Sequence, residues 1–455
     1  YSFGQFYHKT NGFRENNDLN QTLYNGFVQI SLTPNATIQA EFRSTETVTG
    51  DLELRFDPTY FSPTRRRSID MKTYRLGFHY GFAPRSDLLV SLFYQDRVEK
   101  DALSDGGFRF SAKGEESGFN GEVQYLFRAD QFSFIAGGGS FDGNQATDVT
   151  IFSDTFKEIS NERHTNLYVY SFVNFPFNSA LTVGVSGDSF EGQPLDKDQL
   201  NPKLGFTWNP TPTTTLRLAG FRVFKRPIIS NQTLEPTHVS GFQQFFQDLD
   251  TTDSTRYGIA MDQTLTPNLF SGLEFSKRDV AVPAISVNTG RPIELDVDER
   301  TARFYLYWTP NKWVAVSAEY QAERFDPDEI TAIPEAPKIK TELVPLGFNF
   351  FHPNGFSGKL KTTFFAQEGI FEDKLPPFDF YHGKDRFWLV DASIGYRLPR
   401  QQGILTIEAK NLFNETFKYK EIDLVNPKIQ PGRLFSLKWM LAPHSFLRSE
   451  RTLRP

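Results

Sequence analysis

The sequence predicts an all-β fold: a transmembrane antiparallel β-barrel of about 20–22 strands, with short turns on the periplasmic side and long loops on the external side. Three observations predict it. Side chains alternate between apolar and polar with the period of two that a strand requires. Short turns recur at wide, nearly even intervals, and long polar segments lie between them. Together these features describe a series of hairpins rather than helices.

Composition agrees with a strand-rich wall and excludes several functional classes. The 455 residues include 47 Phe and no Cys, so the chain has no disulfide framework, no thiolate zinc site and no cysteine nucleophile. Mean hydropathy is −0.44, and no run approaches the ~18 apolar residues of a membrane-spanning helix. A barrel is consistent with both the low mean hydropathy and the absence of a long apolar run, because only every second side chain of its strands faces lipid. The net charge of −6 gives no support to nucleic-acid binding.

The short turns share a proline followed by asparagine or another small polar residue. Proline presets φ at the first corner of a tight turn, and asparagine tolerates a left-handed conformation after it. The spacing averages about 46 residues, which suits two strands and one long loop. Each copy is therefore interpreted as a hairpin tip. The copies are Thr33-Pro34-Asn35, Ala83-Pro84-Arg85, Pro176-Phe177-Asn178, Asn209-Pro210-Thr211, Thr266-Pro267-Asn268, Thr309-Pro310-Asn311, His352-Pro353-Asn354 and Leu398-Pro399-Arg400, with Ala129-Asp130-Gln131 as a copy without proline.

The segments beside these tips alternate as strands do. Within residues 73–82, Tyr74, Leu76 and Phe78 share one face, while Arg75 and His79 share the other. Residues 314–320 repeat the pattern, with apolar side chains at even positions and polar or small ones at odd positions. A period of two indicates one apolar face and one polar face for each strand.

Long polar segments separate the hairpins. Short and long connections take turns along the chain, as in outer-membrane barrels with tight periplasmic turns and extended external loops. A soluble propeller or multi-domain sandwich is the competing interpretation, but propeller blades have short strands and lack this alternation. The predicted loops are residues 10–20, 47–72, 101–116, 143–162, 192–198, 227–252, 284–299, 325–338, 373–385 and 417–432.

Tryptophan positions favour the membrane interpretation. Four of the five tryptophans fall at the short-turn end of their strands, and only Trp388 lies at the opposite end. Amphipathic rings favour the boundary between lipid and water, so this clustering predicts an aromatic girdle on the periplasmic side. The four are Trp208, Trp308, Trp313 and Trp439.

The closing strands carry a more specific pattern. The run Asn411-Leu412-Phe413-Asn414 ends one strand, and Pro431-Gly432-Arg433 precedes the last one. This resembles the C-terminal signature of the TonB-dependent receptors, in which a strand ending in Asn-Leu-Phe-Asn/Asp leads into the last external loop and Pro-Gly-Arg opens the final strand. We expect the two asparagines to bond backbone groups where the strand leaves the sheet, which is a structural role.

The resemblance implies a function. Residues 1–441 would form an outer-membrane barrel of a Gram-negative bacterium, in contact with outer-membrane lipid and lipopolysaccharide, and residues 442–455 a C-terminal periplasmic tail. The barrel would serve the active uptake of a scarce nutrient such as a siderophore or other metal chelate. Its energy would come from the TonB system, through a plug that we expect upstream of Tyr1. No enzymatic activity and no cofactor are expected.

Two other functions remain open from the sequence. The barrel could be a pore or an anchor for secretion or passive conduction, fused to or assembled with periplasmic domains, because wide barrels without a plug conduct passively. It could instead be a surface adhesion module in which only the loops matter. A fold does not fix a function, so the barrel pattern alone does not separate the three.

Candidate substrate contacts lie in one loop and on the polar faces below it. The longest loop contains Phe242, Phe245 and Phe246, and exposed aromatic rings are costly unless they pack on the barrel or contact a ligand. Packing is the favoured interpretation. The alternation places Arg75, His79, Arg303 and Glu319 toward the lumen as further speculative contacts.

Charged clusters in the loops carry weaker signals. Arg65, Arg66 and Arg67 could meet lipopolysaccharide phosphates or an anionic ligand, although a solvated run is the favoured interpretation. The acidic residues near positions 248–253, 294–299 and 326–329 lack the spacing of an EF-hand. Solvated loop charge is the default interpretation, and no metal site is predicted. No catalytic motif is found, and the seven histidines are dispersed.

Overall fold

The computed structural model describes residues 1–193, 196–227, 232–285, 292–328, 338–372, 380–399, 402–421, 429 and 431–441. No helix in these ranges is long and apolar enough to span a membrane. The predicted tail, residues 442–455, lies outside the described residues.

The described chain is a single antiparallel meander. Twenty strands form one sheet, and two short strands form a separate hairpin. The strands of the sheet are β1 (Ser2–Thr10), β2 (Leu19–Thr33), β3 (Ala36–Thr49), β4 (Arg66–Ala83), β5 (Ser86–Asp105), β6 (Phe108–Arg128), β7 (Phe132–Ile151), β8 (Asp154–Phe175), β9 (Ser179–Glu191), β10 (Lys197–Thr211), β11 (Thr214–Phe224), β14 (Asp253–Thr266), β15 (Leu269–Ile285), β16 (Pro292–Asn311), β17 (Val314–Pro327), β18 (Ile339–Phe351), β19 (Phe356–Glu372), β20 (Phe380–Arg397), β21 (Gly403–Lys410) and β22 (Leu434–Leu441). The small hairpin is β12 (His238–Val239) and β13 (Phe242–Gln243).

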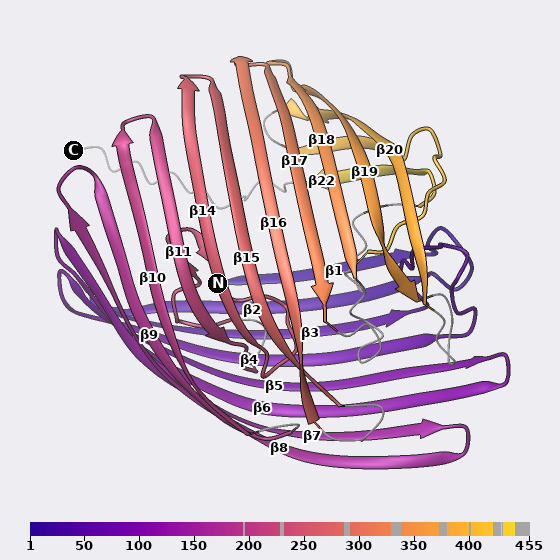
Figure 1. The fold of residues 1–455 in the computed structure, drawn as a ribbon, viewed down its shortest axis with the longest axis horizontal. Helices are drawn as coiled ribbons and strands as arrows, with labels where there is room; N and C mark the ends of the chain where they lie inside the picture. Colours follow the sequence, from indigo (N-terminus) through magenta and orange to yellow (C-terminus); the bar gives the residue numbers. More distant parts are fainter. Residues whose placement is uncertain are drawn as a thin grey trace, which may run out of the picture.

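Each strand of the sheet pairs with the next one along the chain, and β11 pairs with β14 across the small hairpin. Figure 1 shows the result as one curved wall, with β1–β9 running along one part and β10–β20 rising along another. The proline turns join strands at one rim. The ladder register shifts at several of these tips, for example between Gly81 and Ala83. The predicted antiparallel fold of about twenty strands is confirmed.

One expectation about closure is not met in the described residues. A barrel requires its first and last strands to pair, because an open sheet edge cannot face hydrocarbon. The ladders run without a break from β1 to β22, but none joins β22 to β1 within the part of the chain described. The two outermost strands thus have one partner each there.

Three predicted long loops are wrong. Residues 101–116 and 143–162 are mostly strand: β5 and β6 are joined by Gly106 and Gly107, and β7 and β8 by residues 152–153. Within 284–299, every described residue also belongs to β15 or β16. Gly106 and Gly107 have φ of 57° and 88°, the left-handed geometry of a tight hairpin turn. The sequence misled because these strand extensions contain many polar and charged residues, so their composition resembles that of a loop.

The two faces of the wall differ as the alternation predicts. Outward side chains of β4 are strongly exposed, with Tyr74 at 49% and Leu76 at 52%. Thr73 and Gly77, which occupy alternate, inward positions of the same strand, are buried. All five tryptophans are exposed, but Trp388, predicted at the end opposite the other four, lies midway along β20. Exposed apolar side chains over a whole sheet face are typical of a surface that meets lipid.

The C-terminal motif has the structural role that was expected. Asn411 and Asn414 take left-handed φ values of 47° and 57°. The Asn411 side chain donates to the Glu415 carbonyl at 2.9 Å and accepts from the Glu415 amide at 2.8 Å. The Asn414 side-chain oxygen accepts from the Arg433 amide at 3.1 Å. These bonds fasten the end of β21 to the start of β22, so the motif shapes the last external connection.

Buried clusters lie on the inner side of the wall, where loops fold back onto it. Leu54 and Tyr419, from two loops, pack on the inward side chains Phe365, Phe387 and Leu389 of β19 and β20. A second cluster lies under the segment between β11 and β14. The core of this protein is therefore made by loops packing against strands, not by one sheet packing on another.

Candidate functional site

The described residues between β11 and β14, 225–227 and 232–252, fold against the inner wall instead of extending outward. The small hairpin β12–β13 lies in this segment, and its two turn residues, Ser240 and Gly241, have φ of 46° and 86°. Positive φ at both positions is the geometry that matches the twist of a tight hairpin. The segment is called the inner loop below.

Aromatic packing fixes one side of the inner loop. Phe242 is 1% exposed and packs with Phe221, Val223, Val239 and Ala260. Packing was the favoured interpretation for the loop phenylalanines, and these contacts agree with it.

Guanidinium groups cover the three rings of the inner loop. Arg217 and Arg256 each lie 5.5 Å from the Phe242 centroid. Arg278 lies 4.2 Å from the Phe246 centroid, and Arg226 lies 5.4 Å from the Phe245 centroid. Cation–π contacts of this kind strengthen when they are shielded from water, so they add to the apolar packing.

A buried ion pair fixes the middle of the loop. Arg226 and Glu235 are 4% and 3% exposed at the side chain, with 2.9 Å between guanidinium and carboxylate. The Tyr170 hydroxyl of β8 donates to Glu235 at 2.5 Å, and the Lys203 ammonium of β10 lies 3.9 Å away. Gln244 donates to the Tyr170 hydroxyl at 3.1 Å. A buried charge is tolerated only with such partners, so this network specifies where the loop sits.

Residues 232–234 of the inner loop are bound to β6 and β4. A Glu122 carboxylate oxygen on β6 accepts from the Leu234 amide at 2.5 Å and from the Thr233 hydroxyl at 3.1 Å. The Arg75 guanidinium on β4 donates to the Gln232 side chain at 2.5 Å. The inner loop thus links β4 and β6 to β8, β11, β14 and β15, and it narrows the lumen between them.

The structure brings together two of the predicted site residues in a pocket. Arg75 and His79 line a space of about 370 Å³ together with Gln232, Thr233 and Leu234 of the inner loop. Arg75 also pairs with Glu41 at 2.6 Å, and His79 with Asp87 at 2.8 Å. The pocket therefore presents the Arg75 guanidinium and the His79 imidazole, each held by a carboxylate, beside polar groups of the inner loop, which suits a polar ligand.

The other two predicted residues lie elsewhere on the inner wall. Arg303 of β16 and Glu319 of β17 pair with each other at 3.0 Å, and Tyr307 lies beside both. Neither residue lines the pocket of Arg75 and His79. The sequence missed Glu122, Tyr170, Glu235 and Gln244. The first two fall on inward positions of their strands, but nothing in the sequence shows which loop meets them.

A second space lies higher in the lumen, between β5–β8 and the ends of the inner loop. It measures about 340 Å³, and Arg97, Glu116, Glu162, Lys225 and Asp250 contribute charged groups. Burial, together with the nearby carboxylates of Asp250 and Glu116, raises the pKa of Glu162 to about 7. Because this pKa lies above that of the unfolded chain, the stability contributed by Glu162 falls as pH rises from about 4.5 to about 7.

Ion pairs at the mouth involve the predicted basic cluster. Arg65 pairs with Asp101 at 2.6 Å, Arg66 with Asp18 at 2.6 Å, and Arg67 with Glu99. The three arginines are thus not a free, solvated run.

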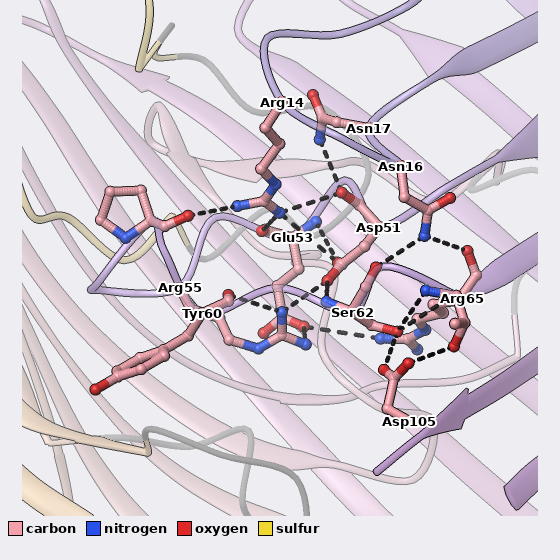
Figure 2. A network of polar contacts seen from close by, with 12 residues as sticks. Arg14, Asn16, Asn17, Asp51, Glu53, Arg55, Tyr60, Ser62, Arg65 and Asp105 are labelled. Atoms are coloured by element: carbon pink, nitrogen blue, oxygen red, sulfur yellow. Dashed lines mark hydrogen bonds and ion pairs between the residues drawn. The ribbon is translucent and has the colours of Figure 1, made fainter.

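Figure 2 shows the network around the buried Asp51, which holds two external loops together. Its carboxylate pairs with Arg55 at 2.8 Å and accepts from the Ser62 amide at 2.7 Å. Its carbonyl accepts from Asn17 at 2.7 Å, and Arg14 donates to the Glu53 carbonyl at 2.7 Å. These bonds therefore hold the two external loops in a fixed position relative to each other.

The acidic groups of the loops are paired in the same manner. Asp253 accepts from Arg222, Asp248 from Arg278, and Lys225 lies 3.6 Å from Asp250. Within the described ranges there is no group of three or more residues that could hold a metal ion.

Comparison with known proteins gives a family and a set of similar folds. Residues 4–276 match the family profile described as TonB dependent receptor-like, beta-barrel. No curated protein sequence matches the chain. Among solved structures, the ferric citrate transporter FecA in its unliganded form is 14% identical with a TM-score of 0.73, covering 96% of this chain and 73% of FecA.

Two further solved structures give the same result. The copper transporter OprC is 11% identical with a TM-score of 0.72, covering 96% of this chain and 75% of OprC. The FrpB iron transporter from Neisseria meningitidis is 11% identical with a TM-score of 0.71, covering 96% of this chain and 76% of FrpB. Identities this low show a shared fold and leave the ligand open.

Proposed function

This chain belongs to the TonB-dependent receptor family, and from that premise we propose that it is the barrel of a receptor that imports a scarce nutrient such as a siderophore or other metal chelate. Barrels of this family are bacterial outer-membrane proteins, and this chain is one of them. Several solved structures of the same fold are described as iron or copper transporters. We extend that cargo class to this chain as a proposal.

The inner loop is the observation that carries the proposal. A pore for passive conduction needs an open lumen, because flux falls as the channel narrows. Here a segment held by a buried ion pair, cation–π contacts and amide hydrogen bonds narrows the lumen. Such a loop would make passage selective and would supply contacts for one ligand class.

The proposed substrate contacts are Arg75 and His79 in their pocket, with Arg303 and Glu319 as a second polar pair further round the wall. Phe245 and Phe246 are partly exposed and could contact a ligand that enters from outside, whereas Phe242 is packed away. A metal chelate with carboxylate or catecholate groups suits the Arg75 guanidinium, which can donate two parallel hydrogen bonds. Transport would be energised by TonB through a plug, without catalysis and without a resident cofactor.

Uptake by living cells tests the function. A strain lacking the gene should lose growth on one or a few iron chelates under iron limitation, and the full-length gene should restore it only when TonB is present. In the restored strain, Arg75→Gln should weaken uptake by about tenfold or more, because a charge-assisted contact is lost.

The control is Arg163→Gln, a β8 substitution outside both candidate sites. It should leave uptake at the wild-type level. Restored growth without TonB would contradict the proposal, and a large steady conductance of the full-length protein in a planar bilayer would favour a passive pore.

A further inference from the structure

The half of β8 nearest its turn with β7 has a strand partner on one side only. β7 pairs with β8 from Asp154 onward, but β9 pairs with it only from Arg163 onward. In an antiparallel ladder, alternate residues direct their N–H and C=O groups to opposite sides. Within the described ranges, the groups of residues 154–162 that turn away from β7 have no backbone partner. Residues 154–162 are called the free edge below.

The free edge lies beyond the hydrocarbon of the membrane. Its residues are fourteen or more positions from Pro176 of the periplasmic turn. At about 3.3 Å per residue and a tilt of roughly 40°, fourteen residues rise about 35 Å, which exceeds the ~25 Å apolar band of such barrels. Residues 154–159 are all exposed. The edge is therefore open to the external medium.

An open edge of this length invites a further strand. Unpaired N–H and C=O groups are a ready template for pairing, and proteins normally keep edge strands short, cover them or close them into a barrel. Here the edge also exposes two large apolar side chains, Phe156 at 61% and Ile159 at 81%. Both would lose contact with water beside an added strand, which adds to the main-chain hydrogen bonds.

The inward face of the free edge is acidic. Asp154, Glu158 and Glu162 fall on the same alternating set as the buried His164, and Phe156 lies between the first two. No lysine or arginine occupies this face of the edge. Burial and two neighbouring carboxylates raise the pKa of Glu162, which is the direction expected of a carboxylate that no cation offsets.

The cations nearest the free edge are already paired on the outward face. Lys157 lies 3.3 Å from Asp148, and Arg163 lies 3.4 Å from Asp142. In the part of the chain that the structure describes, none of the ion pairs includes the three inward carboxylates of the edge. Uncompensated negative charge therefore remains on the inward side.

We propose that the free edge binds an extended, basic peptide segment of a partner protein outside the cell, as an added strand of the sheet. Main-chain hydrogen bonds to β8 provide the affinity, and alternate side chains provide the specificity. Lysine or arginine at every second position of the segment lies beside Asp154, Glu158 and Glu162, since opposite charges on neighbouring strands stabilise a sheet. Neutral or apolar residues at the positions between lie on the outward face, beside Ile159. The proposal goes beyond nutrient uptake and rests on the external location of the edge, not on the cargo.

A second copy of this chain fits the edge less well. Two copies of the free edge would bring two acidic segments together, and like charges on neighbouring strands destabilise a sheet. The charge of the edge thus favours a different, basic partner.

Binding of a synthetic peptide to the full-length protein in detergent tests the proposal. The probe is a peptide of about nine residues that alternates lysine with valine or threonine. We expect it to bind and to slow hydrogen exchange of the backbone amides within residues 154–162. Glu158→Lys should weaken binding by about tenfold, because it replaces an attractive cross-strand pair with a repulsive one.

The control variant makes the same change of charge away from the edge. Glu115 is an exposed residue of β6, two strands from the free edge. Glu115→Lys should leave peptide binding unchanged. An equal loss in both variants would reduce the result to surface charge.

Two further peptides test the proposal independently of how the variants fold. A peptide of the same charge with proline at its centre cannot extend the ladder, so its equal binding would show that no strand is added. Equal binding of a peptide with glutamate in place of lysine would show that the carboxylates are not recognised. Absence of binding and of exchange protection at about 1 mM basic peptide would overturn the proposal, and dimers cross-linked through residues 154–162 would assign the edge to a second copy. Nutrient uptake by Glu158→Lys should stay at the wild-type level, so the transport proposal fails separately.

Discussion

Replacing Val169 with arginine is expected to lower the free energy of unfolding by about 2–4 kcal/mol, because a cation on the lipid face near the bilayer midplane loses its hydration. Val169 is 42% exposed on the outward side of β8, seven residues from the proline of its periplasmic turn. That position falls within the apolar band. Denaturant unfolding of the protein folded into lipid vesicles measures the change.

The same strand offers a matched control. Ile159 is 81% exposed on the same outward set of β8, but it lies seventeen residues from the turn. At that distance the strand extends beyond the hydrocarbon, so Ile159→Arg should change the free energy of unfolding by less than about 0.5 kcal/mol, as at an ordinary surface site. An equal cost at both positions, or none at either, would contradict a membrane-spanning wall.

Replacing Glu235 with alanine is expected to destabilise the inner loop by about 3–5 kcal/mol, since it leaves the buried Arg226 charge without its partner. The Tyr170 hydroxyl and the Lys203 ammonium also lose an acceptor and a counter-charge. We expect the loop to leave the lumen. Limited proteolysis within residues 225–252 should become rapid, and single-channel conductance should rise.

A double variant controls for the loss of the charge itself. Arg226→Met with Glu235→Leu removes both members of the pair and keeps the volume, and such replacements of buried ion pairs are often neutral. It should recover most of the protection from proteolysis. If Glu235→Ala alone were as protected as the wild type, the ion pair would not anchor the loop.

The fold was largely predictable because strand alternation is a local signal. The outward set Tyr74, Leu76 and Phe78, the proline turns and the Asn411–Asn414 motif each depend on neighbouring residues, and each has its predicted role in the structure. The misassigned loops at 101–116, 143–162 and 284–299 fail for the same reason. Local composition does not distinguish a solvated strand extension from a loop, because both are polar.

The candidate site was predicted only in part because it depends on contacts between distant segments. Alternation placed Arg75 on the lumen side, but the contact with Gln232 joins residues 157 positions apart. The inner loop reads as a polar external loop in the sequence, and only its burial against β6, β8 and β14 shows that it turns inward.

Single cysteines along β17 test the central claim, that alternate side chains of this wall face lipid and lumen. The chain has no cysteine of its own, so Ala315→Cys, Val316→Cys, Ser317→Cys and Ala318→Cys can each carry one nitroxide label in lipid vesicles. We expect oxygen dissolved in the bilayer to reach labels at 316 and 318, and a water-soluble nickel complex to reach those at 315 and 317. Equal access of the nickel complex to all four positions would contradict the barrel wall and the transport proposal built on it.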